Sequence, residues 1–243
     1  MLNLYKKNLS IDNERLLSFA HKYQNEYLNN LPFPHIIIDN FLPLNIANHL
    51  EKHFPSKDEQ SFAMQDNDHQ SLKIGRTQDK KFKNIRSDLV HFLNELNGIH
   101  FIDFLEQLTK IRGLIPDPHF KGAAFHQTLP KGKLDIHVDF NFDKKRHLYR
   151  RINVLLYLNK KWEDNYGGHL ELWDHSTKTC HKKVLPLFNR CVIFSTSSNS
   201  YHGHPLPLSC PTNRTRKSIA TYYYTVEPGP NMSETPHSTI WIN

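Results

Sequence analysis

The spacing of apolar residues changes about halfway along this 243-residue chain. In the first part, apolar residues recur every three or four positions, which is typical of helices packed on a core. Ser10 and the acids that follow it suit the start of a helix that runs toward Asn30. Further helices are expected over 44–53, 82–96 and 101–111, with a short strand over 33–39.

From about residue 114 the apolar segments become short, rich in Val, Ile, Phe, Tyr and Thr, and separated by Gly, Pro, Asn and Asp. The expected strands are 122–129, 134–142, 151–158, 169–173, 181–185, 191–195, 201–204 and 217–226. Successive strands without intervening helices argue against a βαβ sheet and favour a sandwich, a barrel or a jelly roll. We therefore expect a mainly β fold with N-terminal helices.

Nothing in the composition marks a linker, so one domain is expected. It would contain a helical region over 1–113, a β core over 114–228 and a C-terminal tail over 229–243. The 15 Phe and 10 Tyr residues are enough for a sizeable core. No apolar run reaches membrane-spanning length, and no export signal is visible, so we expect a cytoplasmic protein that does not enter a membrane.

The three cysteines, Cys180, Cys191 and Cys210, are odd in number and lack metal-site spacing, which favours reduced thiols. The formal net charge is +7, from 31 Lys and Arg against 24 Asp and Glu. The basic residues are mostly scattered and show neither a strong cluster with interleaved aromatics nor a known motif, so a nucleic-acid partner is not expected. Composition gives no indication of the oligomeric state.

The stretch 134–142, LDIHVDFNF, alternates between apolar and polar residues at every position. His137 and Asp139 therefore project from the same face of one expected strand. His202 and His204 share a face 60 to 70 residues later, and Arg216 and Ser218 share a face of the last strand. With 17 histidines in the chain, a solvent-facing polar strand is an alternative interpretation of the first pair.

Two histidines and one carboxylate form the facial triad of non-haem Fe(II) oxygenases. Three protein ligands on one side of an octahedral metal leave three positions for a chelating oxo acid and dioxygen. A guanidinium matches the far carboxylate of a dicarboxylic co-substrate, since it can donate two parallel hydrogen bonds. The order of H-x-D, a distal histidine and R-x-S within one all-β region favours this chemistry over a chance match.

Taken together, five stretches resemble the iron- and 2-oxoglutarate-dependent dioxygenases, in particular the prolyl 4-hydroxylase-like branch. They are LDIHVDF from Leu134, RINVLLYLN from Arg151, the segment from Trp162 through GGHLELW, YHGHP from Tyr201, and RKSIA from Arg216. The resemblance covers about 117–226. It implies a double-stranded β-helix (jelly roll, cupin-like) core and a hydroxylase that releases succinate and CO2. It also implies Fe(II), 2-oxoglutarate and O2, with ascorbate as an optional reductant.

Carried over by position, the resemblance assigns His137, Asp139 and His202 to the iron and Arg216 to the distal carboxylate of 2-oxoglutarate. Ser218 matches the hydroxyl that assists this arginine. His204 falls two positions late and is left as a neighbour or an alternative third ligand. Arg214, the nearby competitor of Arg216, lies in a polar loop where a solvated side chain is expected.

The sequence departs from the family pattern on the strand before H-x-D, where many relatives have a tyrosine that contacts the co-substrate. Gln127 is the residue expected to take this role, and Asn153 is expected to point into the barrel near the site. His169 stands where an acidic residue is often found, and a structural or substrate-facing role is expected for it.

The substrate is left open among peptidyl proline, amino acids, sugars and natural-product scaffolds, so the partner is a small molecule or a peptide. A non-enzymatic or differently metallated cupin-like binding protein is the main alternative. A nucleic-acid dealkylase is ranked lower, because that group has a second arginine where this chain has Tyr222. The polar segment 61–80 is a candidate lid.

Overall fold

The computed structural model describes residues 9–57, 63–64, 66–75, 85–174, 179–233 and 235–242. Its α-helices are α1 (Asn13–Asn29), α2 (Leu44–Lys52), α3 (Ser87–Leu96) and α4 (Ile99–Thr109). The strands up to the middle of the chain are β1 (His35–Ile38), β2 (Ala63–Met64), β3 (Gln70–Gly75), β4 (Ile115–Pro116), β5 (Ala124–Val138), β6 (Phe142–Asp143) and β7 (Leu148–Tyr157). The others are β8 (Leu170–Trp173), β9 (Cys180–Val184), β10 (Arg190–Ser195), β11 (Tyr201–His204), β12 (Arg216–Thr225) and β13 (Ile240–Trp241).

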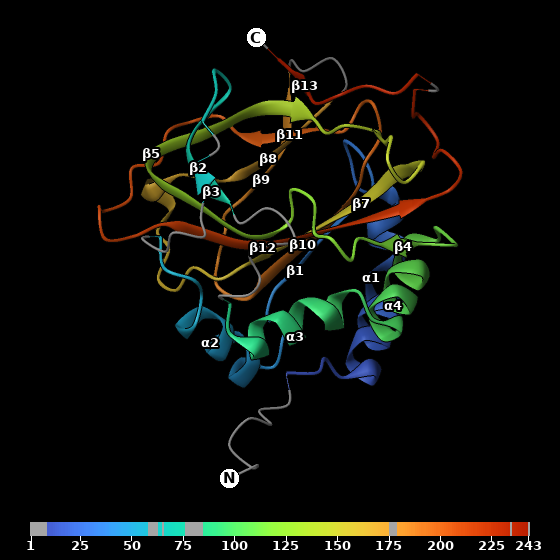
Figure 1. Ribbon diagram of the computed structural model, residues 1–243, viewed down its shortest axis with the longest axis horizontal. Coiled ribbons are helices and arrows are strands. Elements are labelled where there is room, and N and C mark those ends of the chain that lie inside the picture. Colours follow the sequence, from blue (N-terminus) through green and yellow to red (C-terminus); the bar gives the residue numbers. More distant parts are fainter. Residues whose placement is uncertain are drawn as a thin grey trace.

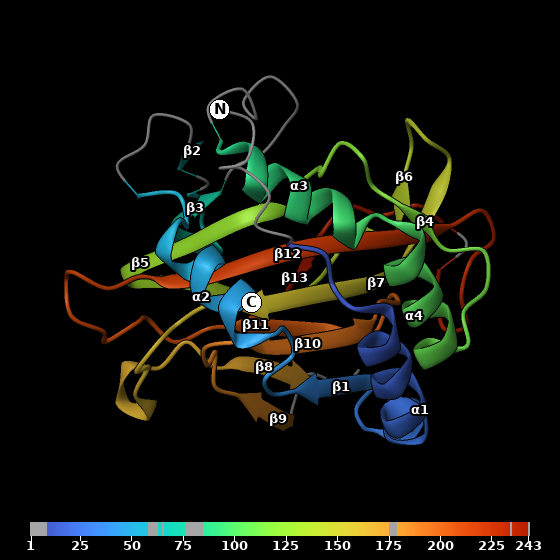
Figure 2. The same cartoon turned by 90° about the horizontal axis from the view of Figure 1, so that it is seen from below.

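The strands form a curled antiparallel sheet in the order β1-β10-β7-β12-β5-β11-β8-β9, and the helices cover one outer face of it (Figures 1 and 2). The expected mainly β fold with N-terminal helices is thereby confirmed. Asp12 caps α1, because its Oδ1 accepts from the backbone N–H of Glu14 at 3.1 Å, so the cap expected at Ser10 is wrong. Among the described residues, no helix is long and apolar enough to cross a bilayer.

Strands β7 and β12 are buried on both faces, and the two faces contact different surroundings. Ile152, Val154 and Leu156 of β7 pack in the core shared with the helices. The alternate residues Asn153 and Tyr157 line an internal cavity. This alternation follows from the two-residue period of a strand. The sheet therefore separates an apolar helix-packing layer from a polar interior.

Strand β5 takes part in both halves of the curled sheet. Its first arm pairs with β12, where Thr128 lies opposite Arg216, and its second arm pairs with β11, where His137 lies opposite His202. Between the arms the strand bends (Figure 1), and Lys131 in this stretch has φ 68°. The sequence predicted two separate strands here, 122–129 and 134–142, but one bent strand forms because both arms find partners.

A bulge lies where β5 meets β11. His137 faces His202 and Leu134 faces His204, so three steps on β5 match two on β11. Gly203 makes this possible, since a Cβ at that position would lie 2.6 Å from the backbone oxygen of Asp135. An inserted residue reverses which parity faces inward. Odd-numbered residues therefore face the cavity near the end of β5, whereas even-numbered residues face it in the first arm.

Two further regions differ from the expectations. The candidate lid over 61–80 contains β2 and β3, and β3 pairs with β5, while 61–62, 65 and 76–80 lie outside the described residues. The expected tail contains β13, whose Ile240 and Trp241 pair with Val138 and His137. Neither short strand has an alternating pattern long enough to be read from sequence.

Candidate metal centre and co-substrate pocket

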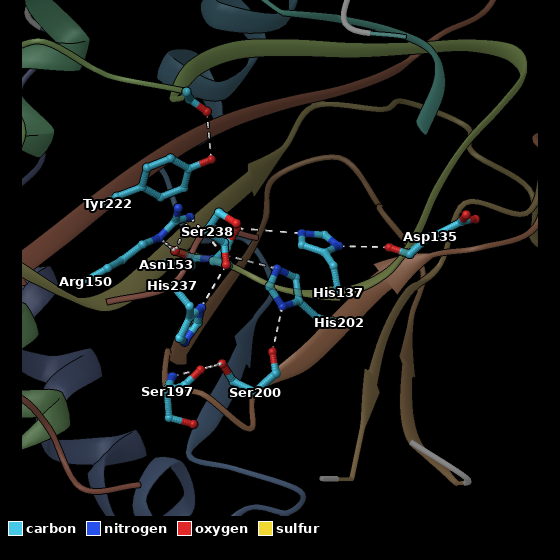
Figure 3. Close-up of polar contacts among 12 residues, drawn as sticks. Asp135, His137, Arg150, Asn153, Ser197, Ser200, His202, Tyr222, His237 and Ser238 are labelled. Atoms are coloured by element: carbon cyan, nitrogen blue, oxygen red, sulfur yellow. Dashed lines mark hydrogen bonds and ion pairs between the residues drawn. The ribbon is translucent and has the colours of Figure 1, made fainter. Parts of the chain in front are cut away.

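His137 of β5, His202 of β11 and Asp139, the residue just past the end of β5, converge; Figure 3 shows how the two imidazoles lie. The Nε2 atom of His137 lies 3.7 Å from Asp139 Oδ1, and that of His202 lies 3.4 Å from Asp139 Oδ2. The ligand atoms of the three side chains all lie within 4.8 Å of one another. Within the described residues, these three side chains form the cluster of potential metal ligands, counting His, Cys, Asp and Glu as possible ligands.

Both imidazoles are oriented by backbone carbonyls. His137 Nδ1 donates to the oxygen of Asp135 at 2.8 Å, and His202 Nδ1 donates to that of Ser200 at 2.9 Å (Figure 3). A neutral imidazole that donates from Nδ1 keeps a lone pair on Nε2, the atom that faces Asp139 here. Burial, followed by the neighbouring His137, lowers the pKa of His202 to about 4, which favours this neutral form.

Asp139 is held by a buried arginine and an amide. Its Oδ2 accepts from Asn153 Nδ2 at 2.8 Å and lies 3.0 Å from a terminal nitrogen of Arg150. Arg150 also donates to Asn153 Oδ1 from two nitrogens, at 3.0 and 2.8 Å. Burial alone would raise the pKa of Asp139, but the charge of Arg150 and the two imidazoles hold it well below its usual range. The carboxylate is therefore ionised and fixed in orientation.

Arg150 is in turn enclosed by aromatic rings. Its guanidinium carbon lies 3.5 Å from the centroid of the Tyr222 ring and 5.0 Å from that of Phe140. The Tyr222 hydroxyl donates to the backbone oxygen of Gly122 at 2.8 Å (Figure 3). Stacking on an aromatic face stabilises a desolvated guanidinium. The expected placement of Asn153 near the site agrees with this geometry, whereas sequence reasoning missed Arg150.

Arg216 and Ser218 line the same cavity as the three metal-ligand candidates. Arg216 Nε donates to the oxygen of Gly168 at 2.7 Å, and a terminal nitrogen donates to the Tyr157 hydroxyl at 3.0 Å. Gly168 has φ 72°, and a Cβ there would lie 3.0 Å from Arg216 Cδ, so only glycine suits this contact. Arg216 is fixed at its root and keeps other N–H groups for a ligand.

Residues 123–224 match the protein family described as the 2OG-Fe(II) oxygenase superfamily. The matched span contains all three metal-ligand candidates together with Arg216 and Ser218. The chain carries a 2OG-Fe(II) oxygenase domain. This family implies Fe(II), 2-oxoglutarate and O2.

The mouse protein "Prolyl 3-hydroxylase OGFOD1" is 28% identical over 148 residues, which are 59% of this chain and 25% of that protein. This chain thus spans about a quarter of the length of that curated relative. One solved structure is of a prolyl hydroxylase from Trichoplax adhaerens in complex with a hypoxia inducible factor peptide fragment. It has a TM-score of 0.63 at 18% identity, and the match covers 86% of this chain and 91% of that one. HygX from Streptomyces hygroscopicus, with nickel, 2-oxoglutarate and hygromycin B bound, has a TM-score of 0.54 at 7% identity and covers 84% and 87%. At these identities the two structures support the fold of the oxygenase domain.

Gln127 does not line the cavity of the oxygenase domain, so its expected place in the site is wrong. Its side chain donates to the oxygen of Pro55 at 2.9 Å and accepts from the Thr215 hydroxyl at 2.7 Å. Its neighbours His126 and Thr128 line the cavity instead. Counting back from His137 in steps of two gives position 127, but the bulge at Gly203 reverses the parity and brings 126 and 128 inward.

Three further basic residues line this cavity: His126 and Lys73, which the sequence did not assign, and His204, which it left as a neighbour or an alternative third ligand. His204 lies outside the metal-ligand group, and its Nε2 is 3.5 Å from the Thr128 hydroxyl. Burial and the neighbouring Lys73 lower the pKa of His126 to about 3. His169 lies outside this cavity and bonds Asp164 at 3.0 Å.

The C-terminal strand β13 closes the outer edge of the oxygenase site. The Trp241 ring lies 4.9 Å from that of His137, centroid to centroid, and stacks on His69 at 4.8 Å with an interplanar angle of 9°. Asn141 anchors the segment before it, donating to the backbone oxygens of Ser233 and Thr235. This segment therefore belongs to the surroundings of His137 rather than to a free tail.

Proposed function

We propose that this chain is an Fe(II)- and 2-oxoglutarate-dependent hydroxylase in which His137, Asp139 and His202 bind the metal. The observation that carries the proposal is that these side chains and Arg216 line one cavity. A dicarboxylic oxo acid can then reach the metal with one end and the guanidinium with the other. Arg216 would bind the distal carboxylate, with Ser218 beside it.

The donor set fits the metal by its chemistry. Two imidazole Nε2 atoms and one ionised carboxylate are the ligands that non-haem Fe(II) oxygenases use, with further positions left open. When bound, Fe(II) would activate dioxygen and couple this step to the oxidation of 2-oxoglutarate, which yields succinate and CO2.

The residues of the chain hold the reactants in place. Asn153 and Arg150 fix the carboxylate of Asp139, and the carbonyls of Asp135 and Ser200 fix the two imidazoles. Gly168 and Tyr157 fix Arg216. Such positioning contributes to catalysis because the reacting groups need not be ordered during the reaction.

For the substrate, we propose a prolyl residue within a peptide. The support is that the curated relative is named a prolyl 3-hydroxylase and that the Trichoplax structure contains a peptide fragment. Amino acids, sugars and natural-product scaffolds are the competing classes, and the hygromycin B in the HygX structure makes an amino sugar a necessary comparison.

The proposal is tested by succinate formation. Purified protein with Fe(II) and 2-oxoglutarate should form succinate slowly on its own and faster with a proline-containing peptide. A His137→Ala variant should reduce succinate to background, because loss of a direct ligand should cost more than the roughly 10- to 100-fold that neighbours of ligands cost. His21→Ala, an exposed histidine on α1, serves as the matched control and should retain wild-type turnover.

The result that would overturn the proposal is a protein that binds zinc or manganese after anaerobic purification and forms no succinate with any metal. That outcome would favour the cupin-like binding protein instead. A nucleic-acid substrate is not part of the proposal, since Tyr222 takes the position of the second arginine of the dealkylases.

We also propose a reducing, cytoplasmic location. All three cysteines are described, and all are free, with Cys191 and Cys210 buried. Free thiols suit a reducing compartment.

A further inference from the structure

Beyond Arg216, the inner end of the cavity contains polar atoms that the protein leaves unpaired. His126 is 8% exposed and His204 is 3% exposed. His126 Nε2 and His204 Nδ1 are fully buried and have no hydrogen-bond partner among the described residues. A buried polar atom without a partner costs roughly 1–3 kcal/mol, so such atoms are rare in proteins. Two of them in the same cavity therefore need a physical explanation.

Strand register places His126 next to the residues assigned to the distal carboxylate. Ser218 lies opposite His126 on one side and opposite Tyr157 on the other. Side chains directly opposite each other on one face of a sheet have Cβ atoms about 5 Å apart. A carboxylate within reach of Ser218 is therefore within reach of His126 Nε2.

A second row of the sheet brings two cations and His204 together. Thr128 lies opposite Arg216 of β12 and, on its other edge, opposite Lys73 of β3. All three residues line the cavity, and His204 reaches the Thr128 hydroxyl from the facing strand β11. If that hydroxyl donates to Nε2, the proton of His204 is on Nδ1, the unpaired atom. Two cations and an N–H donor then line the same cavity.

We propose that His126, His204 and Lys73 bind 2-oxoglutarate together with Arg216 and Ser218. This inference rests on the proposed function and assigns three residues that the family pattern of H-x-D, distal histidine and R-x-S leaves out. Arg216 donates through Nε to Gly168 and through one terminal nitrogen to Tyr157, so it cannot satisfy a carboxylate with all of its N–H groups. Bound 2-oxoglutarate would select the tautomers with the proton on His126 Nε2 and His204 Nδ1, which are neutral donors, and Lys73 supplies a second charge.

The proposal makes stability and binding change in opposite directions. His204→Leu and His126→Leu remove an unpaired buried atom, so each variant, loaded with Ni(II) but without co-substrate, should unfold a few degrees above wild type. The same variants should bind 2-oxoglutarate between about 10- and 100-fold more weakly, because a hydrogen bond to a charged group is lost. Ni(II) replaces iron because it binds such ligands without supporting turnover. Binding is measured by anaerobic calorimetry and unfolding by differential scanning calorimetry.

The matched control is His35→Leu on β1. His35 is as buried as His204, but its Nδ1 donates to the oxygen of Phe33 at 2.9 Å and it does not line the cavity. Its replacement should lower the unfolding temperature and leave 2-oxoglutarate affinity unchanged. For the charge, Lys73→Met should weaken binding and Lys73→Arg should restore most of it, whereas Lys182→Met on the exposed part of β9 should have no effect.

The outcomes separate this inference from the proposed function. If wild type binds 2-oxoglutarate and the two histidine variants bind it equally well, or if they are destabilised as His35→Leu is, the inference is wrong while the proposed function stands. If wild-type protein loaded with Ni(II) does not bind 2-oxoglutarate, both are wrong. Should a leucine variant fail to fold, His204→Gln and His126→Gln test the same sites with smaller losses of affinity.

Discussion

At the metal end of the cavity, every polar atom that orients a ligand has a protein partner. The imidazoles of His137 and His202 donate to backbone carbonyls, and Asp139 accepts from Asn153 and Arg150. At the inner end, His126 and His204 each retain a buried nitrogen with no partner among the described residues. The protein thus completes the geometry of the metal site by itself, whereas the inner end is complete only when a ligand supplies the missing partners.

The strongest test of this contrast is the loss of Arg216. Arg216→Gln should raise the KM for 2-oxoglutarate by about 100-fold, because a charge-assisted contact is removed, and should leave metal affinity near wild type. Steady-state kinetics and a metal titration provide the two measurements. Arg214→Gln is the control, since Arg214 lies in a loop and donates to the oxygens of Lys160 and Lys161. Equal effects of the two variants would contradict the assignment of Arg216.

A smaller effect is expected at the support of the metal end. Asn153→Leu removes the amide that donates to Asp139 and accepts from Arg150. Groups that orient metal ligands typically contribute 10- to 100-fold to metal affinity, so a loss of about 10-fold is expected. The affinity for Ni(II), measured by calorimetry, should fall, and the unfolding temperature should fall as well, because buried N–H groups of Arg150 lose their acceptor. Unchanged metal affinity would show that Arg150 alone holds the carboxylate.

The smallest effect is a change in pH dependence at the inner end. The pKa of His126 is lowered to about 3 in the folded protein, whereas an unfolded histidine titrates near 6.5. Between these values the unfolded chain binds a proton that the folded chain does not. The free energy of unfolding therefore decreases as the pH falls from 6.5 toward 3. His126→Leu should therefore reduce the slope of unfolding free energy against pH by about 1.4 kcal/mol per pH unit between pH 6 and 4. Urea titrations of both proteins in this range measure it, and identical slopes would contradict the shift.

The sequence was sufficient for the parts of the site that depend on short-range spacing. His137 and Asp139 are two residues apart at the end of one arm of β5, and Arg216 and Ser218 are two apart on β12, so strand alternation alone put each pair on one face. The composition of 151–158 and 217–226, rich in β-branched and aromatic residues, likewise predicted most of the two strands that carry Asn153 and Arg216. The assignment of these residues to metal and co-substrate remains a proposal.

What could not be predicted depends on where the strands meet. Gln127 was chosen by comparison with the family tyrosine, but the bulge opposite Gly203 shifts the inward face by one residue, so His126 and Thr128 line the cavity instead. Lys73 enters the cavity from β3, whose six residues have no clear alternation. Arg150 looked like one basic residue among many, because only the folded protein places it 3.0 Å from Asp139. Each of these depends on contacts between distant segments, which a periodic pattern does not contain.

Strand β13 gives the protein a built-in optical reporter. The indole of Trp241 lies 4.9 Å from the His137 ring, whereas Trp162 belongs to a separate cluster with Leu208 and Cys210. Indole emission is sensitive to a paramagnetic or heavy ion a few ångströms away, so occupancy of the metal site can be followed as quenching of intrinsic fluorescence. A label-free titration of the ion, in the unmodified chain, follows from the position of this one ring.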